Sequence, residues 1–202
     1  MATSEIAVLD YGLGNLRSVI RGLEAAGARP KVTNDPETIR SADGLLLPGV
    51  GAFAEGMNKL GPLISLVKEE AITKPLLGIC LGMQMLLEES EEHGLHKGLG
   101  FVPGKVRLFP KRPSMKIPQM GWNTISPSNH PLFEGIPDQT YVYFVHSYYA
   151  DTIPEYTIAT TDYIVSYASA VCFDNVMGVQ FHPEKSGDVG IKILKNYVQM
   201  TE

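Results

Sequence analysis

The stretch Pro75-Leu-Leu-Gly-Ile-Cys-Leu-Gly-Met-Gln-Met-Leu-Leu-Glu-Glu89 decides the fold of this chain. Its first part, residues 75–79, is short and continuously apolar, as expected of a strand that is buried on both faces. The second part, residues 81–89, predicts a helix. A buried strand that turns directly into a helix is the repeating unit of an α/β sheet, and Cys80 stands at the turn.

The rest of the first half repeats this pattern of strand and helix. We expect strands at residues 6–9, 31–33 and 44–47, and helices at residues 16–23 and from residue 53 to about residue 72. Asn15 is expected to cap the first helix and Gly27 to stop it. Because the strands are continuously apolar rather than alternating, they predict a parallel sheet that helices cover on both faces.

The second half of the chain changes character. Aromatic and β-branched residues, broken by proline and glycine, dominate residues 101–123 and 141–181, so the short strands there should include antiparallel pairs. A last helix is expected at residues 189–198. The chain carries no repeat and no linker. We therefore predict one α/β domain over residues 1–202, with a mixed, mainly parallel central sheet flanked by helices.

Composition narrows the classes of function. The chain has 202 residues, 44% of them apolar, and a net charge of −5, which indicates a folded core and no general attraction to nucleic acid or acidic membranes. No apolar run approaches the roughly 18 residues of a membrane span, and the N-terminus lacks the basic region of a signal peptide. The two cysteines, Cys80 and Cys172, fit a reducing compartment, so we expect a soluble, cytoplasmic protein.

The segment Gly78-Ile-Cys-Leu-Gly82 matches the turn that holds a catalytic nucleophile, with cysteine in place of serine. The glycines on either side of Cys80 leave room where strand and helix backbones approach, and the turn aims the side chain out of the sheet. The start of a helix would favour a thiolate there. A cysteine in a strand is more often buried filler, but the glycines and the change from strand to helix favour the nucleophile.

A cysteine nucleophile needs a base, and His182 is the best candidate among the five histidines. It follows an apolar strand at residues 176–180, at the carboxyl end where open α/β sheets place their sites. Glu184, beyond a proline, can orient the ring, which completes a triad in the order cysteine, histidine, glutamate. The His-x-Glu pair could instead bind a metal, but no third ligand stands at a useful spacing, so no metal is expected.

Backbone N–H donors for a tetrahedral intermediate could come from two places. Pro48-Gly-Val-Gly51 follows the strand at residues 44–47, and its glycines permit backbone angles that turn N–H groups toward Cys80, although an ordinary βα turn fits the same residues. The N–H of Leu81 is the other candidate. Gly12-Leu-Gly14 lacks the third glycine of a dinucleotide fingerprint, because Arg17 stands there, so no cofactor is expected.

Taken together, Gly78-Ile-Cys-Leu-Gly-Met-Gln84 and Gln180-Phe-His-Pro-Glu184 resemble the class I glutamine amidotransferases. A narrower resemblance, to the glutaminase subunits of imidazole glycerol phosphate synthase, rests on Met83, on Met120-Gly-Trp-Asn123 and on His182-Pro-Glu-Lys-Ser186. Matching segments span nearly the whole chain in the family's order. The resemblance implies a flavodoxin-like α/β fold and hydrolysis of glutamine to glutamate and ammonia through a cysteine thioester.

The resemblance also implies roles for single residues. Cys80 would attack the amide carbon of glutamine, and His182, held by Glu184, would move the thiol proton to the departing ammonia. The oxyanion would be held by Gly49, Val50, Gly51 and the N–H of Leu81. Glutamine would be bound by Gln84, Glu92, His146, Ser147 and Tyr148. Glu92 suits the α-ammonium, although an acidic run is usually a solvated face, and His146 could be a satisfied core histidine.

Members of this family deliver ammonia to a (β/α)8-barrel synthase subunit. The resemblance therefore implies a heterodimer that makes imidazole glycerol phosphate and AICAR in histidine biosynthesis. Asn15, Trp122 and Lys185 match interface positions, although this single tryptophan could equally belong to the core. Gln119 departs from the family, which commonly has histidine before Met-Gly-Trp-Asn, so an amide would have to fill that role.

Two other functions stay open. The same triad could serve another acceptor, in anthranilate, aminodeoxychorismate or guanylate synthesis, although Met83 and Met120-Gly-Trp-Asn123 argue against it. The fold could also be a non-catalytic binding module that regulates a partner. The intact set of Cys80, His182 and Glu184 argues against that function.

Overall fold

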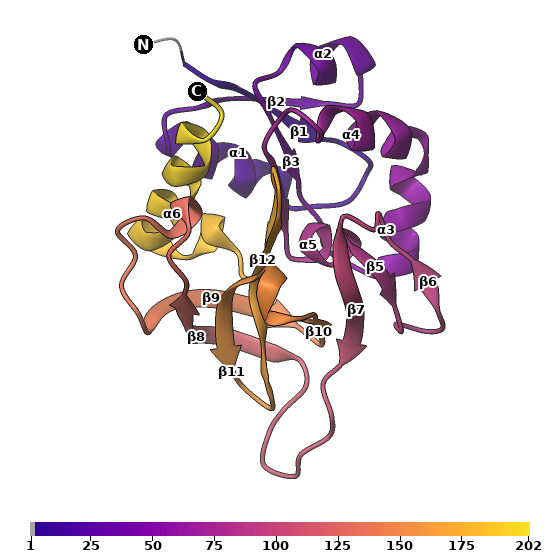
Figure 1. The fold of residues 1–202 in the computed structure, drawn as a ribbon, viewed down its shortest axis with the longest axis vertical. Helices are drawn as coiled ribbons and strands as arrows, with labels where there is room; N and C mark the ends of the chain where they lie inside the picture. The colour runs from indigo at the N-terminus through magenta and orange to yellow at the C-terminus, as the bar shows by residue number, and fades with distance from the viewer. Residues whose placement is uncertain (1–2) are drawn as a thin grey trace.

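The computed structural model describes residues 3–202, and a mixed sheet runs through its centre (Figure 1). Predictions that concern Met1 and Ala2 lie outside the described residues. The helices are α1 (Leu16–Ala25), α2 (Pro36–Ser41), α3 (Phe53–Leu60), α4 (Ile64–Glu70), α5 (Leu81–Met85) and α6 (Gly187–Gln199). The strands are β1 (Glu5–Leu9), β2 (Arg29–Thr33), β3 (Gly44–Leu47), β4 (Leu76–Ile79), β5 (Leu87–Ser90), β6 (His96–Lys97), β7 (Val102–Leu108), β8 (Gln119–Pro127), β9 (Thr140–His146), β10 (Tyr148–Asp151), β11 (Thr157–Asp162), β12 (Ser166–Phe173) and β13 (Val176–Val179).

The sheet has a parallel part and a largely antiparallel part. Strands β2, β1, β3, β4 and β13 lie side by side in that order and are parallel. The order continues through β12, β10, β7, β5 and β6, where only β5 and β7 pair in parallel. Strands β8 and β9 form an antiparallel pair that β11 joins to β12. These pairings confirm the predicted mixed sheet with antiparallel strands in the second half.

Helices cover both faces of the parallel part, as Figure 1 shows with α1 and α6 on one side and α3 and α4 on the other. Leu23 of α1 and Leu194 of α6 belong to one core cluster, and Phe53 of α3 and Val67 of α4 belong to the other. Tyr197 ties α6 to the sheet, because its Oη donates to the carbonyl oxygen of Leu45 at 2.6 Å. The helix that we expected near the C-terminus is therefore confirmed.

One end of the sheet is formed by β2. Its second residue is Pro30, which stands opposite Ile6 of β1. On either side of the proline, Arg29 and Lys31 make ion pairs with Glu5 of β1, at 3.3 and 2.6 Å. Charged side chains and a proline thus occupy this edge.

Two helix predictions were wrong in extent. The helix expected at residues 81–89 ends at Met85, and β5 follows it. The glutamates of β5 favour a helix, but Leu87 is fully buried and β5 pairs with both β6 and β7, so tertiary pairing overrides local propensity. The helix expected from residue 53 to about residue 72 is split by a 3-10 turn at Gly61–Leu63, since Pro62 lacks the N–H that an unbroken helix requires.

Two features near helix starts were also missed. Helix α2 was not predicted, although Asp35 followed by Pro36 is a typical helix start. The Asp35 carboxylate accepts the N–H of Thr38 at 2.8 Å. The side chain of Asn15 makes no capping hydrogen bond to α1, contrary to the prediction. The carbonyl oxygen of Asn15 accepts N–H groups of the first turn instead, so the backbone alone closes this helix end.

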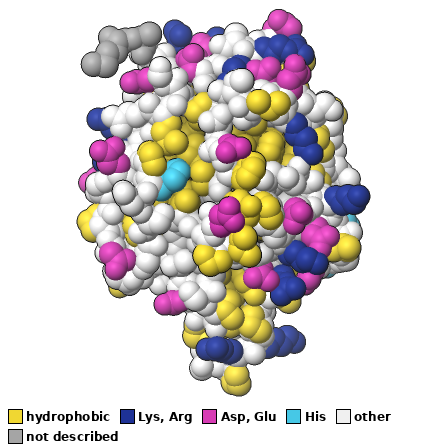
Figure 2. All heavy atoms as spheres, in the orientation of Figure 1, with side chains coloured by type: hydrophobic (Ala, Val, Ile, Leu, Met, Phe, Trp, Pro, Cys, Tyr) yellow, Lys and Arg dark blue, Asp and Glu magenta, His cyan; other side chains and the backbone are white. Residues whose placement is uncertain are grey.

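Charges on the surface are mixed. On the face seen in Figure 2, basic side chains are interspersed with acidic ones and form no continuous positive field. Two of the ion pairs join Lys105 to Glu89 and Arg107 to Asp151. Within residues 3–202, no helix is both long enough and apolar enough to cross a membrane.

A close backbone approach holds α5 against β3, and it gives a test of the packing. A Cβ atom added at Gly82 would stand 1.9 Å from the carbonyl oxygen of Leu47. Gly82→Ala must therefore push α5 away from the sheet, and we expect it to lower the free energy of unfolding by about 3 kcal/mol in urea titrations. Gly61→Ala is the control, because its Cβ would meet no heavy atom of the described residues within 4 Å. Equal stability of the two variants would contradict this account.

Candidate active site

Cys80 occupies a strained turn between β4 and α5. Its φ of 55° and ψ of −109° lie outside the regions that residues with a side chain usually adopt. Its N–H donates to the carbonyl oxygen of Val179 at 2.8 Å, and its own carbonyl oxygen accepts the N–H of Gln84 at 3.1 Å. The side chain is 7% exposed. The turn thus holds a partly accessible sulfur at the carboxyl end of a central strand.

His182 and Glu184 follow the neighbouring strand, β13. Since β13 and β4 are parallel and Val179 is paired with Ile79, the segments after both strands leave the sheet at the same edge. Nδ1 of His182 lies 2.8 Å from Oε1 of Glu184, and the two side chains are 2% and 1% exposed. The structure therefore brings together Cys80, His182 and Glu184, although more than 100 residues separate the cysteine from the histidine along the chain.

The environment of His182 favours its protonated form. Burial alone lowers the pKa of its imidazole, but the neighbouring Cys80 and the hydrogen-bonded carboxylate of Glu184 outweigh burial and raise the pKa to about 9. The other ring nitrogen, Nε2, is buried and has no hydrogen-bond partner among residues 3–202. Glu184 thus holds the ring at Nδ1, and Nε2 is available to a reacting group.

A cavity of about 380 Å³ opens beside the sulfur. Its wall contains most of the residues that the sequence singled out, together with Val145: Val50, Gly51, Cys80, Leu81, Gln84, Glu92, His146, Ser147, Tyr148 and His182. Gly49 and Glu184 are not among the residues that line the cavity. A Cβ atom at Gly49 would stand 2.9 Å from the backbone nitrogen of Gly82, so this glycine lets the segment after β3 pack directly on α5.

The segment after β3 exposes its next two residues at the cavity. Val50 is 38% exposed, and Gly51 has a φ of 107°, in the region that glycine tolerates best. Among the described residues, no three His, Cys, Asp or Glu side chains gather closely enough to hold a metal ion.

Glu92 is held by a contact that its sequence context does not reveal. Its Oε2 accepts the N–H of Phe53 at the first turn of α3, at 2.6 Å. The carboxylate therefore lies in the cavity wall rather than only on an acidic, solvated surface. This position suits the carboxylate to meet a cation in the cavity.

His146 has both ring nitrogens engaged. Nδ1 lies 2.7 Å from the carbonyl oxygen of Tyr148, and Nε2 lies 3.2 Å from Oη of Tyr167. Burial lowers the pKa of the imidazole to about 4, so the ring is neutral near pH 7. The ring thus behaves as a satisfied buried histidine even though it lines the cavity.

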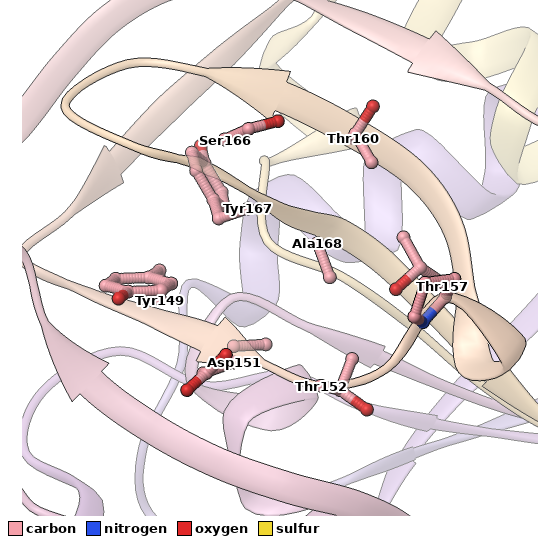
Figure 3. Close-up of a pocket in the computed structure, with 10 residues that line it drawn as sticks. Tyr149, Asp151, Thr152, Thr157, Thr160, Ser166, Tyr167 and Ala168 are labelled. Atoms are coloured by element: carbon pink, nitrogen blue, oxygen red, sulfur yellow. The ribbon is translucent and has the colours of Figure 1, made fainter.

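Tyr167 lines a second hollow, of about 300 Å³. Figure 3 shows this hollow, with Tyr149 of β10 and Tyr167 of β12 among the side chains that line it. Most of the other labelled side chains there carry hydroxyl groups. Because Tyr167 contacts His146, this hydrogen-bonded pair contributes to the walls of both hollows.

One residue at the sulfur was not predicted from the sequence. Gln180, directly after β13, is fully buried, and its Nε2 lies 3.7 Å from Sγ of Cys80. The available signal was its place two residues before His182, at the same sheet edge. Sγ also lies 3.9 Å from the carbonyl oxygen of Val145, so the sulfur has one donor and one acceptor beside it.

The residues predicted at a partner interface lie outside the cavity. Trp122 of β8 is 56% exposed, so the alternative that places it in the core is wrong. Lys185 is exposed, and its Nζ lies 5.8 Å from the ring centroid of Tyr143 on β9. Asn15 is half-buried before α1. Met120 and Tyr141, on the same pair of strands as Trp122, are also exposed, which gives this face several large apolar side chains.

The family described as glutamine amidotransferase class-I matches residues 7–200. The chain belongs to this family. The imidazole glycerol phosphate synthase subunit HisH of Methanosarcina mazei is 55% identical over 199 residues, which are 96% of this chain and 98% of that protein. The subunit of the same name from Archaeoglobus fulgidus is 45% identical, over 98% and 99% of the two chains. Within the amidotransferases, the chain is thus a member of the HisH family, which confirms the narrower resemblance.

Solved structures of other proteins share the fold. PurLQS from Thermotoga maritima aligns with a TM-score of 0.73 and 18% identity over all of both chains. The glutaminase domain of CTPS from Trypanosoma brucei, with bound acivicin, aligns with a TM-score of 0.69 and 17% identity over 98% of this chain and 92% of that one. At these identities the likeness concerns the fold alone, and it confirms the α/β fold that the family resemblance implied.

The contact between Glu184 and His182 leads to a prediction about pH. Glu184→Gln should lower the pKa of His182 from its value of about 9, because one of the two groups that oppose the effect of burial is lost. An NMR titration of the histidine ring resonances measures this shift. Glu37→Gln, which removes an exposed carboxylate paired with Arg40, is the control and should leave the titration unchanged.

The same shift sets the sign of a stability effect. The folded-state pKa of His182 lies above the roughly 6.5 of an unfolded chain. Its stabilising contribution is therefore complete below about pH 6.5 and is lost as the pH rises through about 9. Across this window the unfolding free energy of the wild type should fall more steeply than that of Glu184→Gln. Parallel pH profiles would contradict the assignment.

Proposed function

We propose that this chain hydrolyses glutamine to glutamate and ammonia and supplies the ammonia to a (β/α)8-barrel synthase subunit. The pair would make imidazole glycerol phosphate and AICAR in histidine biosynthesis. The observation that carries the proposal is the single cavity of about 380 Å³ in which Cys80 and His182 meet the residues suited to hold glutamine. The names of the HisH relatives support the pathway. The two free cysteines fit a reducing environment, which supports a cytoplasmic location.

The chemistry begins at the sulfur. The raised pKa of His182 places the thiol proton on its Nε2, so Sγ of Cys80 attacks the side-chain amide carbon of glutamine as a thiolate. As the tetrahedral intermediate collapses, His182 returns the proton to the departing nitrogen, which leaves as ammonia, and a thioester remains. Water, activated by His182, then releases glutamate. Glu184 orients the ring and stabilises its positive charge through each transfer.

The negative oxygen of the intermediate requires donors close to the sulfur. The N–H of Leu81, the residue directly after the nucleophile, is one of them. The other donors come from the segment of Gly49, Val50 and Gly51, which packs against the start of α5 at Gly49 and lines the cavity at Val50 and Gly51. The open backbone angle of Gly51 and the exposure of Val50 are suited to a segment that presents N–H groups to the cavity.

Glutamine is held at its far end by polar groups on the other side of the cavity. Glu92 takes the α-ammonium with the oxygen that does not bond Phe53. Gln84, Ser147 and Tyr148 line the adjacent wall and contact the backbone of the substrate, while His146 shapes this wall as a neutral ring. Neither a metal nor a cofactor takes part in this scheme.

The partner binds the exposed face of β8 and β9. A free ammonia molecule would be lost to water, so a second active site must lie against this subunit. Trp122 is a large exposed anchor of the kind that dominates binding energies, and Asn15 and Lys185 complete the proposed interface. The whole chain, residues 1–202, acts as one domain in the pair.

Replacing the nucleophile separates the two half-reactions. Cys80→Ala should abolish hydrolysis of glutamine, because no other group can form the thioester, while the partner synthase should still use added ammonia. The measurement is glutamate release together with synthase turnover on ammonia. Cys172→Ser is the matched control. Burial, and to a lesser extent the negative charge of Asp174, raise the pKa of the Cys172 thiol to about 11, so this thiol stays protonated. Glutamine-dependent turnover by Cys80→Ala would refute the mechanism.

Replacing Trp122 tests the proposed interface. Trp122→Ala should weaken binding to the barrel subunit at least tenfold in calorimetric titrations, because exposed tryptophans at interface centres commonly contribute about 2 kcal/mol or more. Ile72→Ala, another exposed apolar residue but outside this face, should bind normally. Unchanged binding by Trp122→Ala would place the partner elsewhere.

Measuring hydrolysis by the chain alone and with a cognate barrel synthase carrying its nucleotide substrate tests the whole proposal. We expect a large rise with the partner and its ligand. Full activity of the isolated chain would support the catalytic triad but contradict the dependence of hydrolysis on the partner. Inactivity in both settings would favour another acceptor pathway or a binding module.

A further inference from the structure

A network of buried polar side chains runs from β8 to the sulfur of Cys80. It has two parts. The amide chain consists of the carbonyl oxygen of Tyr148 and the side chains of Gln84 and Gln180. The anchor consists of the side chains of His146, Tyr167 and Gln119. Each of these five side chains belongs to a buried residue.

The carbonyl oxygen of Tyr148 determines the direction of every hydrogen bond in the amide chain. Nε2 of Gln84 donates to the carbonyl oxygen of Tyr148 and to Oε1 of Gln180, both at 3.0 Å. A carbonyl oxygen only accepts, so this end of Gln84 must be its NH2 group, and its second hydrogen needs the oxygen of Gln180. The nitrogen of Gln180 then remains for Sγ of Cys80, at 3.7 Å.

This direction matters for the charge on the sulfur. The thiol of Cys80 can donate to the carbonyl oxygen of Val145 at 3.9 Å, a contact that favours the neutral form. An amide N–H favours the ionised form, because a donor interacts more strongly with an anion than with a neutral sulfur. Besides His182, Gln180 therefore supplies a contact that strengthens when the thiol loses its proton.

The contact with the carbonyl oxygen of Tyr148 also determines which ring nitrogen of His146 carries the hydrogen. Nδ1 of His146 lies 2.7 Å from the carbonyl oxygen of Tyr148, and two acceptors cannot face each other at this distance, so Nδ1 carries a hydrogen. The ring packs against Phe109 and Phe144, with centroids at 5.3 and 5.7 Å, and burial holds its pKa low enough to keep it neutral. Nε2 is therefore bare and must accept.

The only donor described near Nε2 of His146 is the hydroxyl of Tyr167, at 3.2 Å. If that hydroxyl instead donates to Oε1 of Gln119, at 3.0 Å, then Nε2 of Gln119 stays buried without a partner among residues 3–202. A carboxamide turned by 180° exchanges its oxygen and nitrogen at nearly the same positions. In that orientation Gln119 donates to Tyr167, and Tyr167 is free to donate to His146.

We propose that this buried network, anchored on His146 as the neutral Nδ1–H tautomer, points an amide N–H of Gln180 at the sulfur of Cys80. Gln180 touches the reacting atom. Tyr167 and Gln119 are positioning residues that act through His146. The consequence for glutamine hydrolysis rests on the proposed function, whereas the tautomer and the contact with the sulfur do not.

The first test reads the tautomer directly in the wild-type protein. With 15N-labelled histidine at pH 7, two-bond 1H–15N spectra should show His146 with hydrogen on Nδ1 and none on Nε2. The signals are assigned by their loss in His146→Asn. A ring with hydrogen on Nε2, or on both nitrogens, would overturn the proposal whatever the activity of the protein.

The second test measures the ionisation of the Cys80 thiol through its rate of alkylation by iodoacetamide. It uses a Cys172→Ser background, so that only Cys80 reacts. Gln180→Met removes the donor at similar volume, and we expect the ratio of the rates at pH 7 and pH 10 to fall about tenfold. The titratable groups around the sulfur stay the same in both proteins; they are Tyr11, Glu92, His146, Tyr148, His182 and Glu184.

Tyr163→Phe is the matched control, because it removes a hydroxyl that donates to the carbonyl oxygen of Lys116, outside the network. Its rate ratio should equal that of the background protein. Gln180→Asn, which keeps an amide on a shorter side chain, should recover part of the loss. A wild-type ratio in a folded Gln180→Met protein would overturn the proposal. A reduced ratio in a protein whose parent hydrolyses no glutamine would uphold the network and refute the proposed function instead.

Discussion

The backbone turn at Cys80 is the constraint on which the rest of the site depends. A residue with a side chain at a positive φ is held at a cost of roughly 1–3 kcal/mol, and it persists only where its surroundings permit nothing else. Here β3, β4 and α5 approach so closely that Cβ atoms at Gly78 and Gly82 would collide with backbone. The strained residue therefore stays in place, and its sulfur meets the segment that leaves the adjacent strand β13.

Features with a local cause could be predicted from the sequence. The parallel strands β1, β3, β4 and β13 are largely continuous apolar runs, and the turn at Cys80 is marked by two glycines at fixed spacing. The position of His182 after an apolar strand indicated the sheet edge that it shares with Cys80. Even the missed helix α2 had a local signal in Asp35 and Pro36. In each of these cases the cause lies within a few residues of the feature.

Features that depend on distant partners could not be predicted. Leu87–Ser90 has the composition of a helix, and it is a strand only because β6 and β7 lie beside it. Glu92 reads as part of an acidic surface until Phe53, 39 residues away, donates its N–H to the carboxylate. The contact of Gln180 with Cys80 spans 100 residues. Spacing along the sequence does not show which groups these side chains contact, so the hydrogen bonds of Glu92 and Gln180 emerged only from the fold.

The edge strand β2 limits how this chain can associate with others. A strand from a second molecule that docked there would find no N–H at Pro30, and it would have to strip water from the charged groups of Arg29 and Lys31. Both effects make edge-to-edge aggregation unfavourable at this end of the sheet. A neighbouring protein can meet this edge through side chains, but it gains little by extending the sheet.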